Sequence, residues 1–190
     1  MNVRILRAAE YPVSQWAGGT TAQIYLYPED GDYGRRDFIF RLSSAAIQCP
    51  QSDFTPLPGV ERHIMMLEGS ARLVYQGHGE KTLAPYEAET FDGGWQTTSF
   101  GQGTDFNLML RQGAAGGLWA QELAPGESFD LPCPKGGFAL AFAAQGEALS
   151  GGGRTLGFRD ALLLEGEGEI SLQNCGKTAA RLVGAWIRLP

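Results

Sequence analysis

The chain has 190 residues, enough for one large domain or two small ones with a substantial buried core. Its formal charge of −6 argues against nucleic acid as a partner, because phosphate binding requires a basic face. The 27 glycines are spread mostly singly along the chain, which is typical of many short strands joined by tight turns.

The opening segment, the apolar runs and the cysteines argue against a secreted protein, a membrane-spanning protein and a fold held by zinc or disulfides. The opening MNVRILRAAEYP lacks the apolar core of a signal peptide, and no apolar run approaches the ~18 residues that a membrane span needs. We therefore expect a cytoplasmic protein with no membrane partner. The three cysteines are few and widely spaced, so they predict neither a zinc site nor a disulfide framework.

The first features along the chain are a glycine-rich turn and an alternating strand. The turn WAGGTTAQ at 16–23 contains no lysine and leads into the strand-like IYLYP, so it does not fit a phosphate-binding loop. The later stretch DFIFRLSSA at 37–45 alternates with a period of two. It places Arg41 and Ser43 on the face opposite Phe40 and Leu42.

The central stretch SDFTPLPGVERHIMMLEGSARLVY at 52–75 resembles the strand set of a cupin, with a glycine after an apolar strand and a hairpin beyond it. Metal-binding cupins carry histidines and a glutamate before that glycine, whereas this chain offers Arg62 and His63, and its other histidine lies in a turn. Zinc and iron sites normally need three or four ligands. We expect no metal, and we interpret His63 as a strand histidine with satisfied hydrogen bonds.

The strand TDFNLMLRQG at 104–113 repeats the alternating pattern, with Asp105 and Asn107 opposite a face of Phe106 and two leucines. A loop of glycine and alanine follows at 112–117. We place a domain boundary there, which predicts a first domain at 1–115 and a second, smaller one at 116–190.

An internal echo supports this division. EKTLAPYEAETF, from Glu80, resembles GRTLGFRDALLL, from Gly153, and Glu87 corresponds to Asp160 in this match. Further upstream, Gly69 corresponds to Gly146. The echo predicts an all-β protein built as a duplicated barrel, and chance similarity between two strand-turn-strand segments is the alternative.

Polar side chains at strand positions are the candidates for chemistry. If the strands converge in one barrel, they form a cationic, hydrogen-bonding pocket, because an arginine inside a barrel must be paired with a carboxylate, with carbonyl groups or with a bound anion. Structural pairing of arginine with aspartate is the alternative interpretation. Hydrolytic triads are not indicated, since there is no G-x-S-x-G elbow and no cysteine with a histidine near it in sequence. The candidate residues are Arg41, Ser43, Arg62, Asp105 and Asn107.

Five motifs occur in this order: WAGGTT (16–21), FIFRLSSA (38–45), DFTPLPGVERHIMMLEG (53–69), LAPY (83–86) and TDFNLMLR (104–111). These motifs and their order resemble those of the HutD/Ves family. The resemblance implies a bicupin, two small jelly-roll (cupin) barrels in one chain without metal ligands. It also implies an association with histidine utilisation and binding of a small acid such as N-formylglutamate. One departure is the short turn after Trp16, where many family members have an asparagine before the glycines.

Our preferred hypothesis is a metal-independent bicupin, without a cofactor, that binds a small carboxylate in its first barrel. Arg41 and Arg62 would bind the carboxylate of the acid, because bidentate guanidinium pairing is geometrically selective. Asp105 would orient one arginine, and Trp16 would form an apolar wall over the pocket. Ser43 and Asn107 would add hydrogen bonds.

Two other classes of function are retained as alternatives. The first is a cupin isomerase or hydrolase that works on a small acid by general acid–base catalysis, with His63 or Asp105 as the proton carrier. The second is a protein-interaction module whose pocket is vestigial. A homodimer is a candidate assembly, because bicupins often pair through their sheets.

Overall fold

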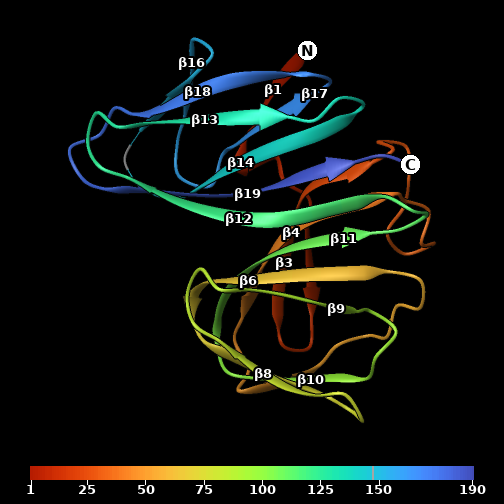
Figure 1. Cartoon of the computed structure of the whole chain (residues 1–190). Coiled ribbons are helices and arrows are strands. Elements are labelled where there is room, and N and C mark those ends of the chain that lie inside the picture. Colours follow the sequence, from red (N-terminus) through yellow and green to blue (C-terminus); the bar gives the residue numbers. More distant parts are fainter. Residues whose placement is uncertain (147) are drawn as a thin grey trace. The chain divides into compact units, whose positions relative to one another are not determined.

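The computed structural model describes residues 1–146 and 148–190 and confirms the predicted all-β class (Figure 1). Every pairing between named strands is antiparallel. The only helical segment among these residues is the short 3-10 turn η1 (Ala8–Glu10). Within the described chain, therefore, no helix could cross a membrane.

The chain divides into two compact units. The central unit is Pro12–Ala114, and the flanking unit combines Met1–Tyr11 with Ala115–Pro190. The division thus falls at the glycine–alanine loop of the sequence. Residues 1–11 were expected in the first domain, whereas the structure pairs β1 (Asn2–Leu6) with β17 (Ala161–Glu165) of the flanking unit.

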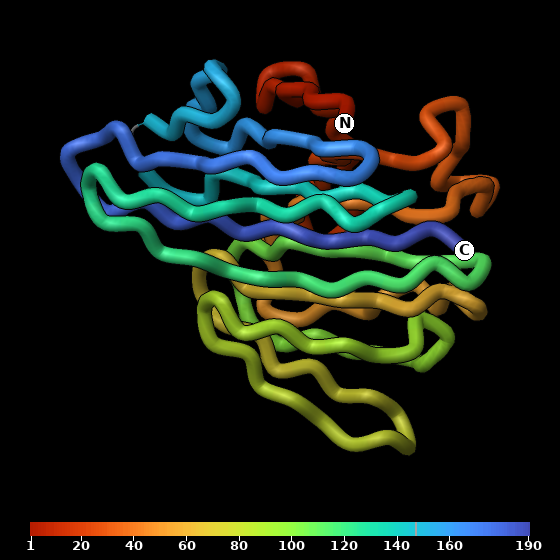
Figure 2. Tube along the Cα trace, turned by 45° about the horizontal axis from the view of Figure 1, so that its top comes forward, coloured from red at the N-terminus to blue at the C-terminus, as the bar shows by residue number. Residues whose placement is uncertain are grey.

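The central unit contains two open sheets. The six-stranded sheet has the order β2-β3-β4-β11-β6-β9: β2 (Val13–Trp16), β3 (Gly19–Tyr27), β4 (Phe40–Ile47), β11 (Gly103–Leu110), β6 (Glu61–Gly69) and β9 (Ala88–Asp92). The four-stranded sheet has the order β5-β10-β7-β8: β5 (Gln51–Asp53), β10 (Thr97–Phe100), β7 (Ala71–Tyr75) and β8 (Gly79–Leu83). The β7–β8 hairpin, olive to yellow-green in Figure 2, forms one edge of the smaller sheet.

The flanking unit also contains two open sheets. Next to β1 and β17, its five-stranded sheet continues with β14 (Gly137–Gln145), β19 (Ala180–Arg188) and β12 (Ala115–Leu123). Its four-stranded sheet has the order β13-β18-β15-β16: β13 (Ser128–Cys133), β18 (Gly168–Asn174), β15 (Leu149–Gly151) and β16 (Arg154–Leu156).

The two units repeat one strand order, as the internal echo predicted. The order β4-β11-β6-β9 corresponds to β12-β19-β14-β17, and β5-β10-β7-β8 corresponds to β13-β18-β15-β16. The echoed turn has the same backbone in both copies, with φ of 66° at Tyr86 and 65° at Arg159. The carboxylates of Glu87 and Asp160 each accept a hydrogen bond from the backbone amide three residues earlier, at 2.9 and 3.0 Å.

Each unit buries apolar side chains from both of its sheets in one cluster. In the central unit such a cluster includes Ile64 and Met66 of β6 and Leu73 of β7. In the flanking unit it includes Leu164 of β17 and Leu172 of β18. Burial of one face per sheet is what the period-two pattern of the sequence requires.

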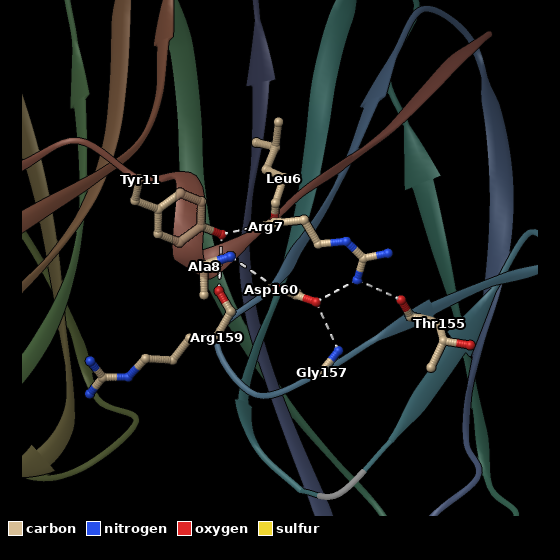
Figure 3. A network of polar contacts seen from close by, with 8 residues as sticks. All are labelled: Leu6, Arg7, Ala8, Tyr11, Thr155, Gly157, Arg159 and Asp160. Atoms are coloured by element: carbon tan, nitrogen blue, oxygen red, sulfur yellow. Dashed lines mark hydrogen bonds and ion pairs between the residues drawn. The ribbon is translucent and has the colours of Figure 1, made fainter.

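The N-terminal segment is fixed within the flanking unit by a polar network around Asp160 (Figure 3). The Asp160 carboxylate accepts hydrogen bonds from the Ala8 amide at 2.9 Å and the Gly157 amide at 3.0 Å, and Nη1 of Arg7 pairs with it at 2.6 Å. The Tyr11 hydroxyl lies 2.9 Å from the carbonyl oxygen of Arg159. These contacts explain why residues 1–11 belong to this unit although they precede the central one in sequence.

Candidate functional site

All the predicted site residues line one cavity of about 260 Å³ that lies entirely within the central unit. The residues that the sequence placed there are Trp16, Arg41, Ser43, Arg62, Asp105 and Asn107. Their convergence is therefore a structural fact. Whether they bind a ligand remains a prediction.

The pairing register of three neighbouring strands brings the polar side chains together. On β11, Met109 pairs with Arg41 of β4 on one side and with Arg62 of β6 on the other. Residues paired directly across antiparallel strands project to the same face, so both arginines share the face of Met109. Two further rows continue that face: Ser43–Asn107–Ile64 and Ala45–Asp105–Met66.

The Arg41 guanidinium is held by neutral groups. Its Nε donates to Oε1 of Gln23 at 2.9 Å, and its Nη1 donates to Oγ of Ser43 at 3.3 Å. Its Cζ lies 4.1 Å from the ring centroid of Tyr33, which is a cation–π distance. Burial lowers the pKa of Arg41, while Tyr33 and Asp105 oppose that shift. None of these neighbours neutralises its charge by forming an ion pair.

The Arg62 guanidinium is held mainly by aromatic rings. Its Cζ lies 4.5 Å from the ring centroid of Phe54 and 5.3 Å from that of Phe91. Its Nη2 donates a long hydrogen bond of 3.4 Å to Oδ1 of Asn107, and its buried Nε has no hydrogen-bond partner. Burial is also the main reason that the pKa of Arg62 is lowered. The arginine thus retains a buried donor, Nε, that no described residue uses.

Asp105, which was predicted to orient one arginine, forms no direct hydrogen bond or ion pair with Arg41 or Arg62 among the described contacts. Its Oδ1 accepts hydrogen bonds from the Ala45 amide at 2.9 Å and from Nδ2 of Asn107 at 2.6 Å. Because Oδ1 of the same Asn107 amide accepts from Arg62, Asp105 orients Arg62 through Asn107. Among the described residues no carboxylate forms an ion pair with Arg41 or Arg62. A direct Arg–Asp ion pair is thus absent from this part of the chain, although the charges of Asp105 and the two arginines still attract each other.

The electrostatics of the cavity favour an anionic guest. Burial raises the pKa of the Asp105 carboxyl to about 6, although the Ala45 amide, the charge of Arg62 and the Asn107 amide oppose the rise. Two acidic residues line the cavity with the two arginines, but only Asp105 is buried, since Asp53 is exposed. At neutral pH the buried part of the cavity thus contains two guanidinium groups and one carboxylate that ionises reluctantly, in a region where water screens charge poorly.

Trp16 and His63 occupy different environments. Trp16 ends β2, lines the cavity and is 36% exposed, and its role as an apolar wall over a ligand stays a prediction. His63 lies on the opposite face of β6 from Arg62, where its Nε2 is 2.8 Å from Glu61 and its Nδ1 is 2.9 Å from Oγ1 of Thr90. The prediction of a satisfied strand histidine is confirmed, and His63 is not among the residues that line the cavity.

Sequence reasoning missed three residues that hold the arginines. Phe54 lies in the DFTPLPG motif, whose aromatic residue could have been assigned as an arginine partner. Tyr33 lies in the turn PEDGDYG, where no periodicity indicates a direction for its side chain. Gln23 precedes a β-bulge between Gln23 and Tyr25, which interrupts the alternation along β3.

The HutD family model matches residues 8–182 of the chain. The chain belongs to the HutD family. A conserved protein of unknown function from Pseudomonas aeruginosa PAO1 is similar to it over 100% of both chains, with 26% identity and a TM-score of 0.82. HutD from Pseudomonas fluorescens SBW25 matches 99% of this chain with 100% of its own, at 24% identity and a TM-score of 0.74.

The fold of this HutD family member also resembles that of a metal-containing protein. A bacterial pirin from Escherichia coli in complex with nickel(II) matches 99% of this chain with 100% of its own, at 12% identity and a TM-score of 0.73. This likeness shows a shared, cupin-like fold. The cavity residues do not suit such an ion, since two buried cations face a single buried carboxylate. In the described part of the chain, no three His, Cys, Asp or Glu side chains gather where they could hold a metal.

Proposed function

We propose that this HutD family member is a bicupin, one barrel per unit, that binds a small carboxylate metabolite in the cavity of the central unit without a metal. One observation carries the proposal. Arg41 and Arg62 are only 5% and 8% exposed and both line the cavity, yet among the described residues neither is paired with a carboxylate. A buried charge without a counter-ion is costly, so a bound anion is the missing partner.

The size of the cavity and the family both limit the choice of anion. The volume of about 260 Å³ is just below the ~300–1,000 Å³ that is usual for small-molecule sites, which favours a small metabolite. The family resemblance suggests an acid of histidine degradation such as formylglutamate, whose flux the protein would regulate. Formate is a further candidate, because the HutD structure from Pseudomonas fluorescens is of a formate condition.

Calorimetric titration with formylglutamate, urocanate, glutamate and formate tests the proposal. We expect at least one of them to bind saturably to the wild type and to lose roughly tenfold to a hundredfold in affinity in Arg62→Ala, because a charge-assisted hydrogen bond is worth about 1.5–3 kcal/mol. Arg72→Ala is the matched control, since Arg72 is exposed on β7 and pairs with Glu80. If none of the four acids binds, the protein-interaction alternative becomes the better account.

A second candidate function is catalysis, and the pKa of about 6 at Asp105 favours it. A proton carrier is most effective when its pKa is near the working pH. His63 does not serve this role, because it faces away from the cavity. Product formation in the same titration mixtures, abolished in Asp105→Asn while binding persists, would establish an enzyme. Unchanged ligands after prolonged incubation would leave binding as the function.

A further inference from the structure

Four buried polar atoms in the central unit have no hydrogen-bond partner within the described chain: Oγ of Ser52, Nε of Arg62, the hydroxyl of Tyr75 and Oγ of Ser99. Ser99, Tyr75 and Arg62 are only 1%, 4% and 8% exposed. An unsatisfied buried group costs about 1–3 kcal/mol, so native interiors contain few of them. Their grouping in one interior therefore needs an explanation.

The three hydroxyls lie on one inward face of the four-stranded sheet. Ser52 pairs directly with Ser99, and directly opposed residues project to the same side. Ser99 pairs in turn with Leu73, and Tyr75 follows on the same face of β7. Leu73 and Tyr75 both belong to the buried cluster between the sheets, which shows that this face points inward.

Arg62 connects these hydroxyls with the cavity. Its Cζ lies 5.3 Å from the Phe91 ring centroid, and the Tyr75 ring packs 5.1 Å from the same ring. Burial raises the pKa of Tyr75, and the charge of Arg62 opposes that rise, as expected for close neighbours. Phe54, two residues after Ser52, lines the cavity and covers the guanidinium. The hydroxyls themselves are outside the cavity wall, so a ligand would reach them past Arg62 and Phe54.

The flanking unit shows that the fold does not require polar residues at these positions. Met65 pairs with Ala88 as Phe142 pairs with Ala161, which aligns the two copies. This alignment and the other strand pairings place Ala139 at the position of Arg62, Leu172 at that of Ser99 and Phe129 at that of Ser52. All three belong to or pack against the apolar cluster of the flanking unit. The same strand arrangement thus accommodates apolar side chains at the positions that are polar in the central unit.

We propose that Nε of Arg62 and the hydroxyls of Ser52, Tyr75 and Ser99 form a second acid subsite, and that the ligand is a dicarboxylic metabolite. One carboxylate contacts Arg41, and the other accepts hydrogen bonds from this subsite. The backbones of β4 and β6 lie two strand spacings apart, roughly 9.5 Å, so a molecule with an acid at each end spans the two arginines. Rotation of the Phe54 ring admits the second acid, a side-chain change that is common on binding.

Titration with glutarate, a five-carbon diacid, and butyrate, a four-carbon monoacid, tests the subsite, which rests on the proposed function. We expect glutarate to bind the wild type at least about tenfold more tightly. Tyr75→Phe and Ser99→Ala should each weaken glutarate by about threefold to tenfold and leave butyrate within about twofold. The control is Ser171→Ala, which removes an exposed hydroxyl in the flanking unit. Without ligand, neither test variant should lower Tm, because each removes an unsatisfied group.

Three results would overturn the subsite and leave the proposed function intact. They are equal affinity for the two acids in the wild type, equal weakening of both acids in the variants, and a large fall in Tm of the ligand-free variants, which would indicate a structural role. If Arg41→Ala still abolishes butyrate binding in such a case, only the second acid position is wrong. Failure of both acids to bind the wild type would overturn the subsite as well, and the titration with formylglutamate, urocanate, glutamate and formate would then decide separately whether the proposed function also fails.

Discussion

Replacing Asp105 with asparagine should stabilise the protein at neutral pH, although Asp105 is buried at the centre of the candidate site. Oδ1 of Asp105 accepts both of the hydrogen bonds that the carboxylate receives from the Ala45 amide and from Asn107. The single carbonyl oxygen of asparagine can accept the same two bonds. The substitution therefore removes the ionisation of the group and keeps its geometry.

The magnitude follows from the pKa shift. Burial raises the pKa of Asp105 from 3.8 to about 6, so the folded chain binds more protons than the unfolded chain between those pH values. Stability consequently falls as pH rises through this window and is level above it. At about 1.4 kcal/mol per pH unit, the ionised carboxylate destabilises the wild type by about 3 kcal/mol at pH 7.

Urea denaturation from pH 4 to pH 8 measures this difference. We expect Asp105→Asn and the wild type to unfold with similar free energies near pH 4, and the variant to be more stable by up to about 3 kcal/mol above pH 6.5. Asp130→Asn, which changes an exposed carboxylate on β13, is the control for general charge effects and should not reproduce the divergence.

One result would refute this reasoning. If Asp105→Asn were less stable than the wild type at pH 7, the ionised carboxylate would be a net stabilising partner of the arginines. The unpaired cations that carry the proposed function would then already be neutralised by the protein. A constant difference at every pH would instead show that packing, and not ionisation, separates the two proteins.

Three further outcomes are expected. Asp160→Ala deprives two backbone amides and Arg7 of their acceptor and should lower the unfolding free energy by about 2–4 kcal/mol in urea, whereas Glu10→Ala should not. Gly18→Ala places a methyl group against the indole of Trp16 and should weaken acid binding in calorimetry, an effect that largely disappears in a Trp16→Ala background. Acid affinity should increase severalfold as pH falls from 7 to 5, because protonation of Asp105 removes a repelling charge, and Asp105→Asn should abolish this dependence.

The sequence predicted the site best where the strands are regular. Along β4, β6 and β11, side chains alternate without interruption through the residues that matter, so the faces that carry Arg41, Arg62 and Asn107 could be assigned strand by strand, whereas the pairing register had to show that these faces coincide. The same rule of alternation correctly placed His63 on the face of β6 opposite Arg62. The chemistry of each residue type then limited what such a face could bind.

Partners distant in sequence could not be predicted in the same way. The pairing of β1 with β17 depends on residues about 160 positions apart, and no local pattern encodes it. Gln23 was missed because a bulge shifts the register of β3, and Tyr33 because its direction is set by a turn. The indirect action of Asp105 through Asn107 was missed because alternation gives the face of a side chain and not its hydrogen-bond partner.

The comparison between the units bears on why the central interior is polar. At positions where the central unit has Asp105, Asn107 and Arg62, the pairing register gives the flanking unit Leu182, Gly184 and Ala139. Leu182 and Ala139 belong to the apolar cluster of the flanking unit, so buried polar groups at the equivalent positions are a departure that is expected to reduce stability. Groups of this kind are usual where binding is selected over stability. A ligand that supplies the missing partners should therefore stabilise the central unit by RT ln(1 + [L]/Kd), and acids that fail to do so are not its ligand.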